Sequence, residues 1–443
     1  MSDDRNDDQN PFGDNPFGGF PFGNLGDLSG LFGGAGGDPW ASARQIAASV
    51  ANGGSSESNV DPAERIAFEQ LARVAELQVT SATGLSLSDG TPPLIRPATR
   101  QEWAHATLDA WRPLLETMSG AFNQGMVDPS ALSDQGLDAS ALGFGADFMA
   151  QIMKMMGPMM LSMMAGSMVG HLARNNLGSY DLPLARPDAR ELLVVHANVA
   201  AFTDEWSVPT DDMRLWICLH EYLHHAVLRI PHVRERITRL TSDYVGAFES
   251  NSQALTDQLG GIDPSNPESL SSLEGLMNDP EALMGVVQSE RQRAMLPEIS
   301  AMLAAIVGWV DHMMDRIGGQ LIGSYSMLSE ALRRRRVTAD PTDRFLERMI
   351  GLELDQACYD RGRAFIDGVV ERGGEDALQR LWANADDLPT PNDIVAPGLW
   401  LARIGVEMQD LDLSDLGALD GLETLTGDDP DPDDGGGDPP GDG

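Results

Sequence analysis

The segment 218–227, CLHEYLHHAV, constrains this chain most, because its histidines can act together only on a helix. His220 and His224 are four residues apart, so a helix places them on one face about one turn from each other. The surrounding residues are uncharged, as expected for a helix buried in a folded domain: Ile217, Cys218, Leu219, Tyr222, Leu223 and Ala226. We predict a helix that starts around Asp211 and ends or kinks by Pro231, whose ring breaks the hydrogen-bond ladder.

Two histidines at this spacing can bind one zinc ion, with metal–nitrogen distances of about 2.0–2.1 Å. Glu221 is next to the first histidine and can take a proton from zinc-bound water, whose pKa falls to roughly 7. It can then pass that proton to the leaving amine of a peptide bond. The motif therefore predicts His220 and His224 as metal ligands and Glu221 as the general base. The alternative is a histidine-rich helix without metal.

Two neighbours in the motif are poorer ligands for the same ion. His225 points about a third of a turn away from His224, which favours polar packing or contact with substrate or with a ligand histidine. Cys218 is two residues before His220 and faces roughly the opposite side of the helix. We therefore expect Cys218 to be a small buried apolar residue.

Low-complexity sequence at both ends leaves residues 61–406 as the predicted folded unit. Residues 1–60 form a Gly/Phe-rich arm, expected to be disordered because dense glycine cannot offset its ordering entropy. Residues 407–443 carry thirteen acidic residues and no Lys or Arg, which predicts a disordered acidic tail.

Within 61–406 the pattern is mainly helical, as at 61–84 and 296–318, where apolar residues recur at helical spacing. The best strand candidate is ELLVVHANVAAF at 191–202, which we expect to be an edge strand that pairs with an extended peptide. The predicted fold class is mostly α (α+β), with a small sheet.

Composition narrows the partners and the compartment. The net charge of −38 repels phosphate backbones, so we do not expect nucleic-acid binding. Two cysteines indicate no disulfide framework, and the acidic N-terminus lacks a secretory signal, so we expect a cytoplasmic protein.

The methionine-rich segment 148–170 approaches the length of a membrane span. It also contains Lys154 and Pro158, and methionine suits irregular cores and adaptable interfaces. We therefore predict a buried or partner-facing helix. A protein partner would bind through this segment or through the N-terminal arm.

Beyond the motif, the chain resembles the actinobacterial zinc-dependent metalloproteases of zincin-like fold, some of which are labelled as associated with deazaflavin coenzyme biosynthesis. The matching segments span most of residues 165–403. They are LGSYDLPL at 177–184, LVVHANVAAF at 193–202, RLWICLHEYLHH at 214–225, GWVDHMMD at 308–315, EALRRRR at 330–336, GLELDQACYDRGRAFIDGVV at 351–370 and DLPTPNDIVAPGLWLARI at 387–404. The resemblance implies a mostly helical zincin-type peptidase domain that acts on peptides or proteins. It also implies zinc ligands at His220 and His224 and a catalytic base at Glu221.

A zinc peptidase needs a third protein ligand besides an open position for water. Relatives often carry Glu just before the glycine of GWVDH, where this chain has Val307. Asp311 lies one helical turn further on the same face and is the predicted third ligand. Its carboxylate could bind zinc directly, or it could hydrogen-bond to His220 or His224 and orient that ligand. His312 and Glu330 are the alternatives.

The missing glutamate leaves a second hypothesis open, a zincin fold without catalysis that serves as a binding or scaffolding module. A third hypothesis is hydrolysis of a non-peptide amide in cofactor metabolism.

Overall fold

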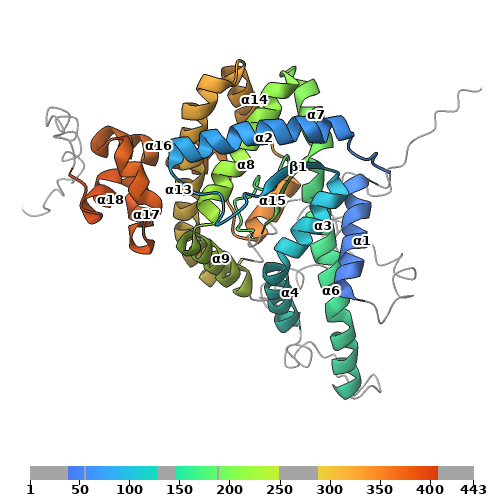
Figure 1. The fold of residues 1–443 in the computed structure, drawn as a ribbon. Coiled ribbons are helices and arrows are strands. Elements are labelled where there is room, and N and C mark those ends of the chain that lie inside the picture. The colour runs from blue at the N-terminus through green and yellow to red at the C-terminus, as the bar shows by residue number, and fades with distance from the viewer. Residues whose placement is uncertain (1–37, 54–55, 127–145, 187–188, 249–287, 408–443) are drawn as a thin grey trace, which may run out of the picture.

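The computed structural model describes residues 38–53, 56–126, 146–186, 189–248 and 288–407 (Figure 1). Helix α8, Thr210–Leu228, carries the histidine motif, and every residue from Trp216 to Leu228 is buried. It ends at Leu228, and helix α9, Pro231–Gly246, begins at the proline that we expected to stop it. Helix α13, Glu290–Leu321, packs against both α8 and α9. The predicted helix boundaries around the motif are confirmed.

The sheet has two parallel strands, β1 (Leu94–Ala98) and β2 (Glu191–Val195), with Leu94 opposite Glu191 and Ala98 opposite Val195. The mostly helical class with a small sheet is therefore confirmed. The predicted strand 191–202 is wrong beyond Val195, because His196–Trp206 forms helix α7. Its buried residues have helical spacing rather than alternation: Asn198, Val199, Phe202 and Thr203.

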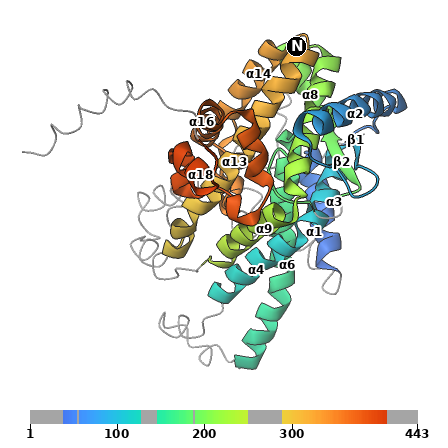
Figure 2. The ribbon, with the colours of Figure 1, turned by 60° about the vertical axis from the view of Figure 1, so that its left-hand side comes forward.

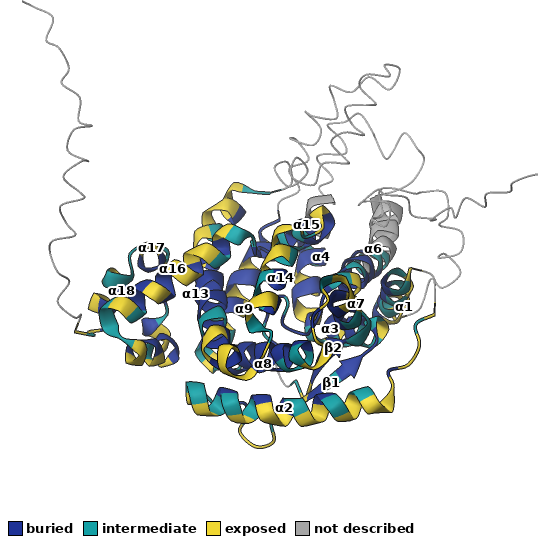
Figure 3. Cartoon of the chain, turned by 90° about the horizontal axis from the view of Figure 1, so that it is seen from above, coloured by how far each residue is buried: buried dark blue, intermediate teal, exposed yellow. Residues whose placement is uncertain are grey.

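Helices cover this centre on several sides. Helix α2 (Pro62–Thr83) packs across α8 with its exposed face outward (Figure 3). The β1 strand leads into α3 (Arg100–Ala110) and α4 (Arg112–Met126), which pack against α6 (Ala146–Asn175).

Helix α1, Pro39–Asn52, lies inside the segment 1–60 that we expected to be a disordered arm, so that boundary is wrong. Asp38 caps the helix, and Ala43, Ala47 and Ala51 form a buried face at a spacing of four. That face lies against α6 at Gly166 and Gly170, where there is no room for a Cβ. Residues 1–37 of the predicted arm and residues 408–443 of the predicted acidic tail lie outside the described residues.

The C-terminal part of the chain packs against another side of α13, mainly through residues 356–373 (Figure 2). It contains α14 (Tyr325–Val337), α15 (Pro341–Met349), α16 (Gln356–Gly373), η3 (Glu375–Trp382), η4 (Ala385–Asp387), α17 (Pro391–Val395) and α18 (Pro397–Arg403). Helices α13 and α16 cross at Gly308 and Gly362, where a Cβ on Gly308 would lie 2.7 Å from Gly362 Cα. The backbones can approach this closely only because both positions are glycine.

The methionine-rich segment lies in α6, and its residues 164–170 are buried, as predicted for a core helix; most of its earlier side chains lie outside the description. By length and composition one described helix, α13, could cross a membrane. The protein itself buries 61% of the most apolar 18-residue stretch of α13.

Candidate metal helix and the adjoining cavity

The two motif histidines lie together on α8, as the spacing predicts. Their ring centroids are 4.3 Å apart, and His224 Nδ1 is 3.0 Å from the carbonyl oxygen of His220. If that nitrogen carries the hydrogen, Nε2 of His224 keeps the lone pair that a metal binds. Burial and the adjacent His220 ring lower the pKa of His224, so the imidazole is neutral.

His220 is buried by contact with Trp216, whose ring stacks on it at a centroid distance of 4.8 Å. Its Nδ1 is buried and has no hydrogen-bond partner within the described part of the chain; the Glu221 carboxylate lies 3.7 Å away. A buried polar atom without a partner is uncommon in proteins and often marks a site for an ion or water.

Glu221 is fully buried and faces a loop at residues 177–181. The backbone N–H of Ser179 donates to its Oε2 and the N–H of Tyr180 donates to its Oε1, each at 3.0 Å. A Cβ at position 178 would lie 2.8 Å from Glu221 Cδ and closer still to Oε1. Gly178 therefore lets the loop close over the carboxylate, which both amides hold in one orientation.

The loop is anchored independently of Glu221. Trp103 Nε1–H donates to the Gly178 carbonyl at 2.8 Å, and Arg186 Nε–H donates to the Ser179 carbonyl at 2.9 Å. The Asp181 carboxylate accepts the N–H of Leu177 at 2.7 Å and that of Gly178 at 3.2 Å. Burial raises the pKa of Glu221, while His220 and the Tyr180 amide favour the charged form.

Asp311, the predicted third ligand, is bound to an arginine and not grouped with the two histidines. Both oxygens of Asp311 accept hydrogen bonds from Arg336, at 3.0 and 3.1 Å, and the Arg336 guanidinium lies 4.0 Å over the Tyr359 ring. Residue 311 thus faces α14, and its charge is neutralised there. Val307, at the preceding turn, is buried in the hydrophobic core.

The two alternative ligands also have other partners. His312 Nε2 lies 3.3 Å from Glu375, and the half-buried Glu330 binds Arg333 and Arg334. In the residues that the structure describes, no three His, Cys, Asp or Glu side chains are close enough to hold one metal ion. His220 and His224 therefore fit zinc as two ligands of an incomplete set.

The remaining motif residues take part in packing. Tyr180 Oη lies 2.9 Å from His225 Nδ1, and burial lowers the pKa of His225 to about 4. Cys218 is buried, and burial raises the pKa of its thiol, which agrees with the apolar role expected for it.

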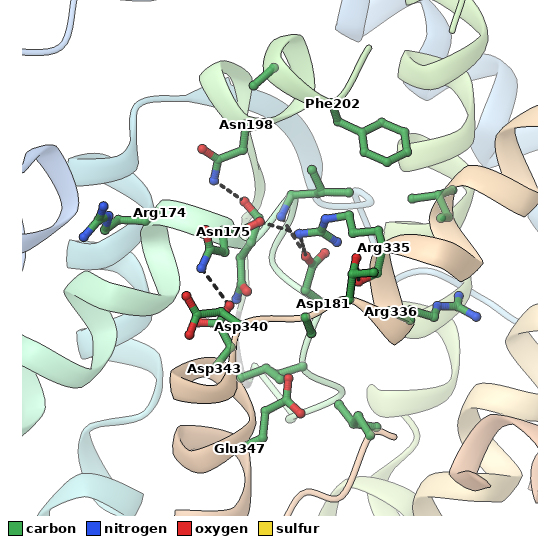
Figure 4. Close-up of a pocket in the computed structure, with 18 of the residues that line it drawn as sticks. Arg174, Asn175, Asp181, Asn198, Phe202, Arg335, Arg336, Asp340, Asp343 and Glu347 are labelled. Atoms are coloured by element: carbon green, nitrogen blue, oxygen red, sulfur yellow. Dashed lines mark hydrogen bonds and ion pairs between the residues drawn. The ribbon is translucent and has the colours of Figure 1, made fainter. Parts of the chain in front are cut away.

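A cavity of about 530 Å³ lies beside α8, with Trp216 and His220 in its wall. Figure 4 shows the part of this cavity where Asp181, Arg335 and Glu347 lie. Its lining contains charges of both signs: Arg100, Arg174, Arg335, Arg336, Arg344, Asp181, Glu205, Asp340, Asp343 and Glu347. Phe202 and Trp206 of α7 add an apolar part. In a protein of net charge −38, this gathering of arginines makes the cavity unusual and suited to a ligand that carries both charges.

Two carboxyl groups on α15 lie in this wall. Asp343 accepts a hydrogen bond from Asn175 Nδ2 at 2.7 Å and lies 3.3 Å from His171 Nε2. The Glu347 carboxyl has no hydrogen bond or ion pair with any described residue. Burial and the nearby Asp343 raise the pKa of Glu347 to about 8. Sequence reasoning missed both residues, and their spacing of four on one helix was the available signal.

The fold and site agree with the comparisons with known proteins. Residues 39–401 match the zincin-like metallopeptidase family, and the chain belongs to it. In this family zinc is the usual metal and hydrolysis the usual reaction.

Among solved structures, the chain is similar to a protein from Chloroflexus aurantiacus described as "a putative hydrolase with a novel fold". The two are 21% identical with a TM-score of 0.52, over 83% of this chain and 98% of that one, which supports the fold. No curated protein matches.

Proposed function

We propose that this protein hydrolyses peptide bonds with a zinc ion bound by His220 and His224. The observation that carries the proposal is the pair of buried imidazoles on α8, one of them in the wall of the charged cavity. Bound zinc would supply Lewis-acid activation of water and of the peptide carbonyl.

In this proposal Glu221 moves the proton. Its Oε1 lies 3.7 Å from His220 Nδ1, so this oxygen is the one assigned to accept the proton of the attacking water. Each carboxylate oxygen has two acceptor positions, so one remains on Oε1 after the Tyr180 amide is bound. The pKa of Glu221, raised by burial, is shifted toward the range that suits a general base.

A second candidate is a peptide-binding module that keeps the zincin fold without catalysis. Two observations favour it: the described residues supply no third metal ligand, and Glu221 is fully buried with both oxygens bound to amides. The two candidates share a ligand class and differ in metal content and turnover.

Zinc analysis of the purified full chain separates the candidates. We expect stoichiometric zinc in the parent protein and its loss in His220→Ala and His224→Ala. Asp311→Ala is the matched control and should retain zinc, because Asp311 is held by Arg336. Zinc loss in that control would instead restore Asp311 as a ligand.

Activity is then measured on a peptide library. Glu221→Gln should keep zinc and lose hydrolysis, since the amide cannot take up the proton. Because the amide also leaves one of the Ser179 and Tyr180 N–H groups without an acceptor, urea unfolding checks that the variant is folded. If the parent protein binds no zinc and cleaves no peptide, the proposal of a peptidase is wrong and the peptide-binding module is the remaining candidate.

A further inference from the structure

We propose that the cavity beside α8 binds a short peptide with both termini free, holding its ammonium group at Glu347 and its carboxylate at Arg335. The inference names the substrate class of the proposed function and rests on it for the reaction. Binding itself requires no metal.

The part of the cavity proposed to bind the ammonium group of the peptide is formed by α15. Glu347 has no partner among the described residues, and Asp343 lies one turn earlier on the same helix. Asp343 Oδ1 is buried and has no hydrogen bond within the described chain, although His171 is near. Asp181 adds negative charge from the 177–181 loop, while Arg344 and Arg348 reduce it.

The geometry favours an organic cation over a metal ion at this end. The described carboxylates do not come close enough in threes to hold a metal. An ammonium group has three N–H donors that can reach separate acceptors. Glu347 and Asp343, one helical turn apart, fit such a spread of donors.

The carboxylate end is defined by Arg335 of α14. Its guanidinium donates to the carbonyl of Asn175, and Asp181 Oδ2 is 3.7 Å away, beyond hydrogen-bond distance. That carboxylate already accepts the amides of Leu177 and Gly178. Arg335 therefore keeps N–H donors for a ligand, and its planar guanidinium matches a carboxylate. Figure 4 shows Arg335 beside Asp181, with Glu347 on the neighbouring helix.

The rest of the wall suits the middle of a short peptide. Phe202, Trp206 and Trp216 offer apolar surface for the side chains of the peptide. His220 also lines the cavity, so a bound peptide would lie next to α8. A volume of about 530 Å³ lies within the roughly 300–1,000 Å³ of small-ligand pockets.

Isothermal titration calorimetry of the full chain with Leu-Phe, in EDTA, tests this binding without metal. We expect N-acetyl-Leu-Phe and Leu-Phe amide each to bind at least about tenfold more weakly, since each lacks one charge-assisted contact. Leucine alone should also bind more weakly.

Variants then assign each end. Glu347→Gln should weaken Leu-Phe about tenfold and leave N-acetyl-Leu-Phe nearly unchanged. Arg335→Lys, which keeps the charge but loses the planar group, should weaken Leu-Phe and leave the amide nearly unchanged. Glu371→Gln, on the exposed surface of α16, is the matched control and should change none of the affinities.

Several outcomes would overturn the inference: equal affinity for free and capped peptides, no binding, or leucine alone binding as tightly as Leu-Phe. Glu347-dependent binding of Mn²⁺ without peptide binding would make the site a cation site instead. Failure of the proposed function is seen separately, as absent zinc or absent hydrolysis, and leaves these affinities unaffected.

Discussion

Replacing Gly178 with alanine tests whether the 177–181 loop fixes Glu221. The added methyl carbon would lie 2.8 Å from Glu221 Cδ and closer to Oε1, so either the loop or the carboxylate must move. Either movement breaks the two hydrogen bonds from Ser179 and Tyr180 to a fully buried carboxylate. Hydrogen bonds to a charged group contribute about 1.5–3 kcal/mol each, so we expect a loss of roughly 3–6 kcal/mol in the free energy of unfolding.

Urea unfolding followed by tryptophan fluorescence measures this loss. Gly120→Ala is the matched control, because Gly120 lies within α4 with nothing near its Cβ position. This control should gain about 0.5–1 kcal/mol from better helix propensity.

A double-mutant cycle with Glu221→Ala identifies the cause. Once the glutamate side chain is removed, Gly178→Ala should cost less than about 1 kcal/mol, because the contacting atoms are gone. The reasoning fails if Gly178→Ala is as stable as the parent, or if its cost is the same with and without Glu221.

Three further changes test other parts of the structure. Gly362→Ala should push α16 away from α13, since its Cβ would lie 3.0 Å from Gly308 Cα. Urea unfolding should show a loss of about 1–3 kcal/mol in the free energy of unfolding, and unchanged stability would contradict the close crossing. Because the pKa of Glu347 is raised from 4.5 to about 8, the folded state loses stability as the pH rises between these values. The free energy of unfolding of Glu347→Gln should therefore increase relative to that of the parent over this pH range and stay level above it. A difference in unfolding free energy that does not change with pH would refute the raised pKa. Arg336→Met leaves Asp311 unpaired and should lower the free energy of unfolding by about 1–3 kcal/mol. Adding Asp311→Asn to this variant should recover part of the loss. If the effects of the two substitutions simply add, the two side chains do not interact.

Local sequence signals predicted the motif helix well. Helix α8 follows from its apolar surroundings and from Pro231, because both act within a few residues of the chain. The same rules contained the signal for α1: the pair Asp38-Pro39 caps it just as Asp61-Pro62 caps α2. Dense glycine around α1 hid that signal.

Long-range pairing could not be predicted in this way. Strand β1 contains Pro97, which weakens a strand assignment, and it forms by pairing with β2 almost a hundred residues later. The run after Val195, HANVAAF, is mainly apolar and contains Val199 and Phe202, which suit a strand, yet burial on one helical face decides its structure.

The site shows the same division. The spacing of His220 and His224 fixes their common face, whereas the amides that hold Glu221 come from Ser179 and Tyr180, some forty residues earlier. Asp311 lies on the expected helix, but the position of Arg336 on another helix decides what its carboxylate binds. Such partners depend on tertiary packing, which spacing along one helix does not encode.

The close pairing of α1 with α6 has a consequence for synthesis on the ribosome. Ser162 donates a hydrogen bond to the carbonyl of Pro39 at 2.7 Å, across 123 residues of sequence. At about 5–20 residues per second, the alanine face of α1 leaves the ribosome roughly 6–25 s before its glycine partner does. During that interval the nascent chain exposes the face of α1 that α6 covers in the folded protein, which is the kind of apolar surface that chaperones bind.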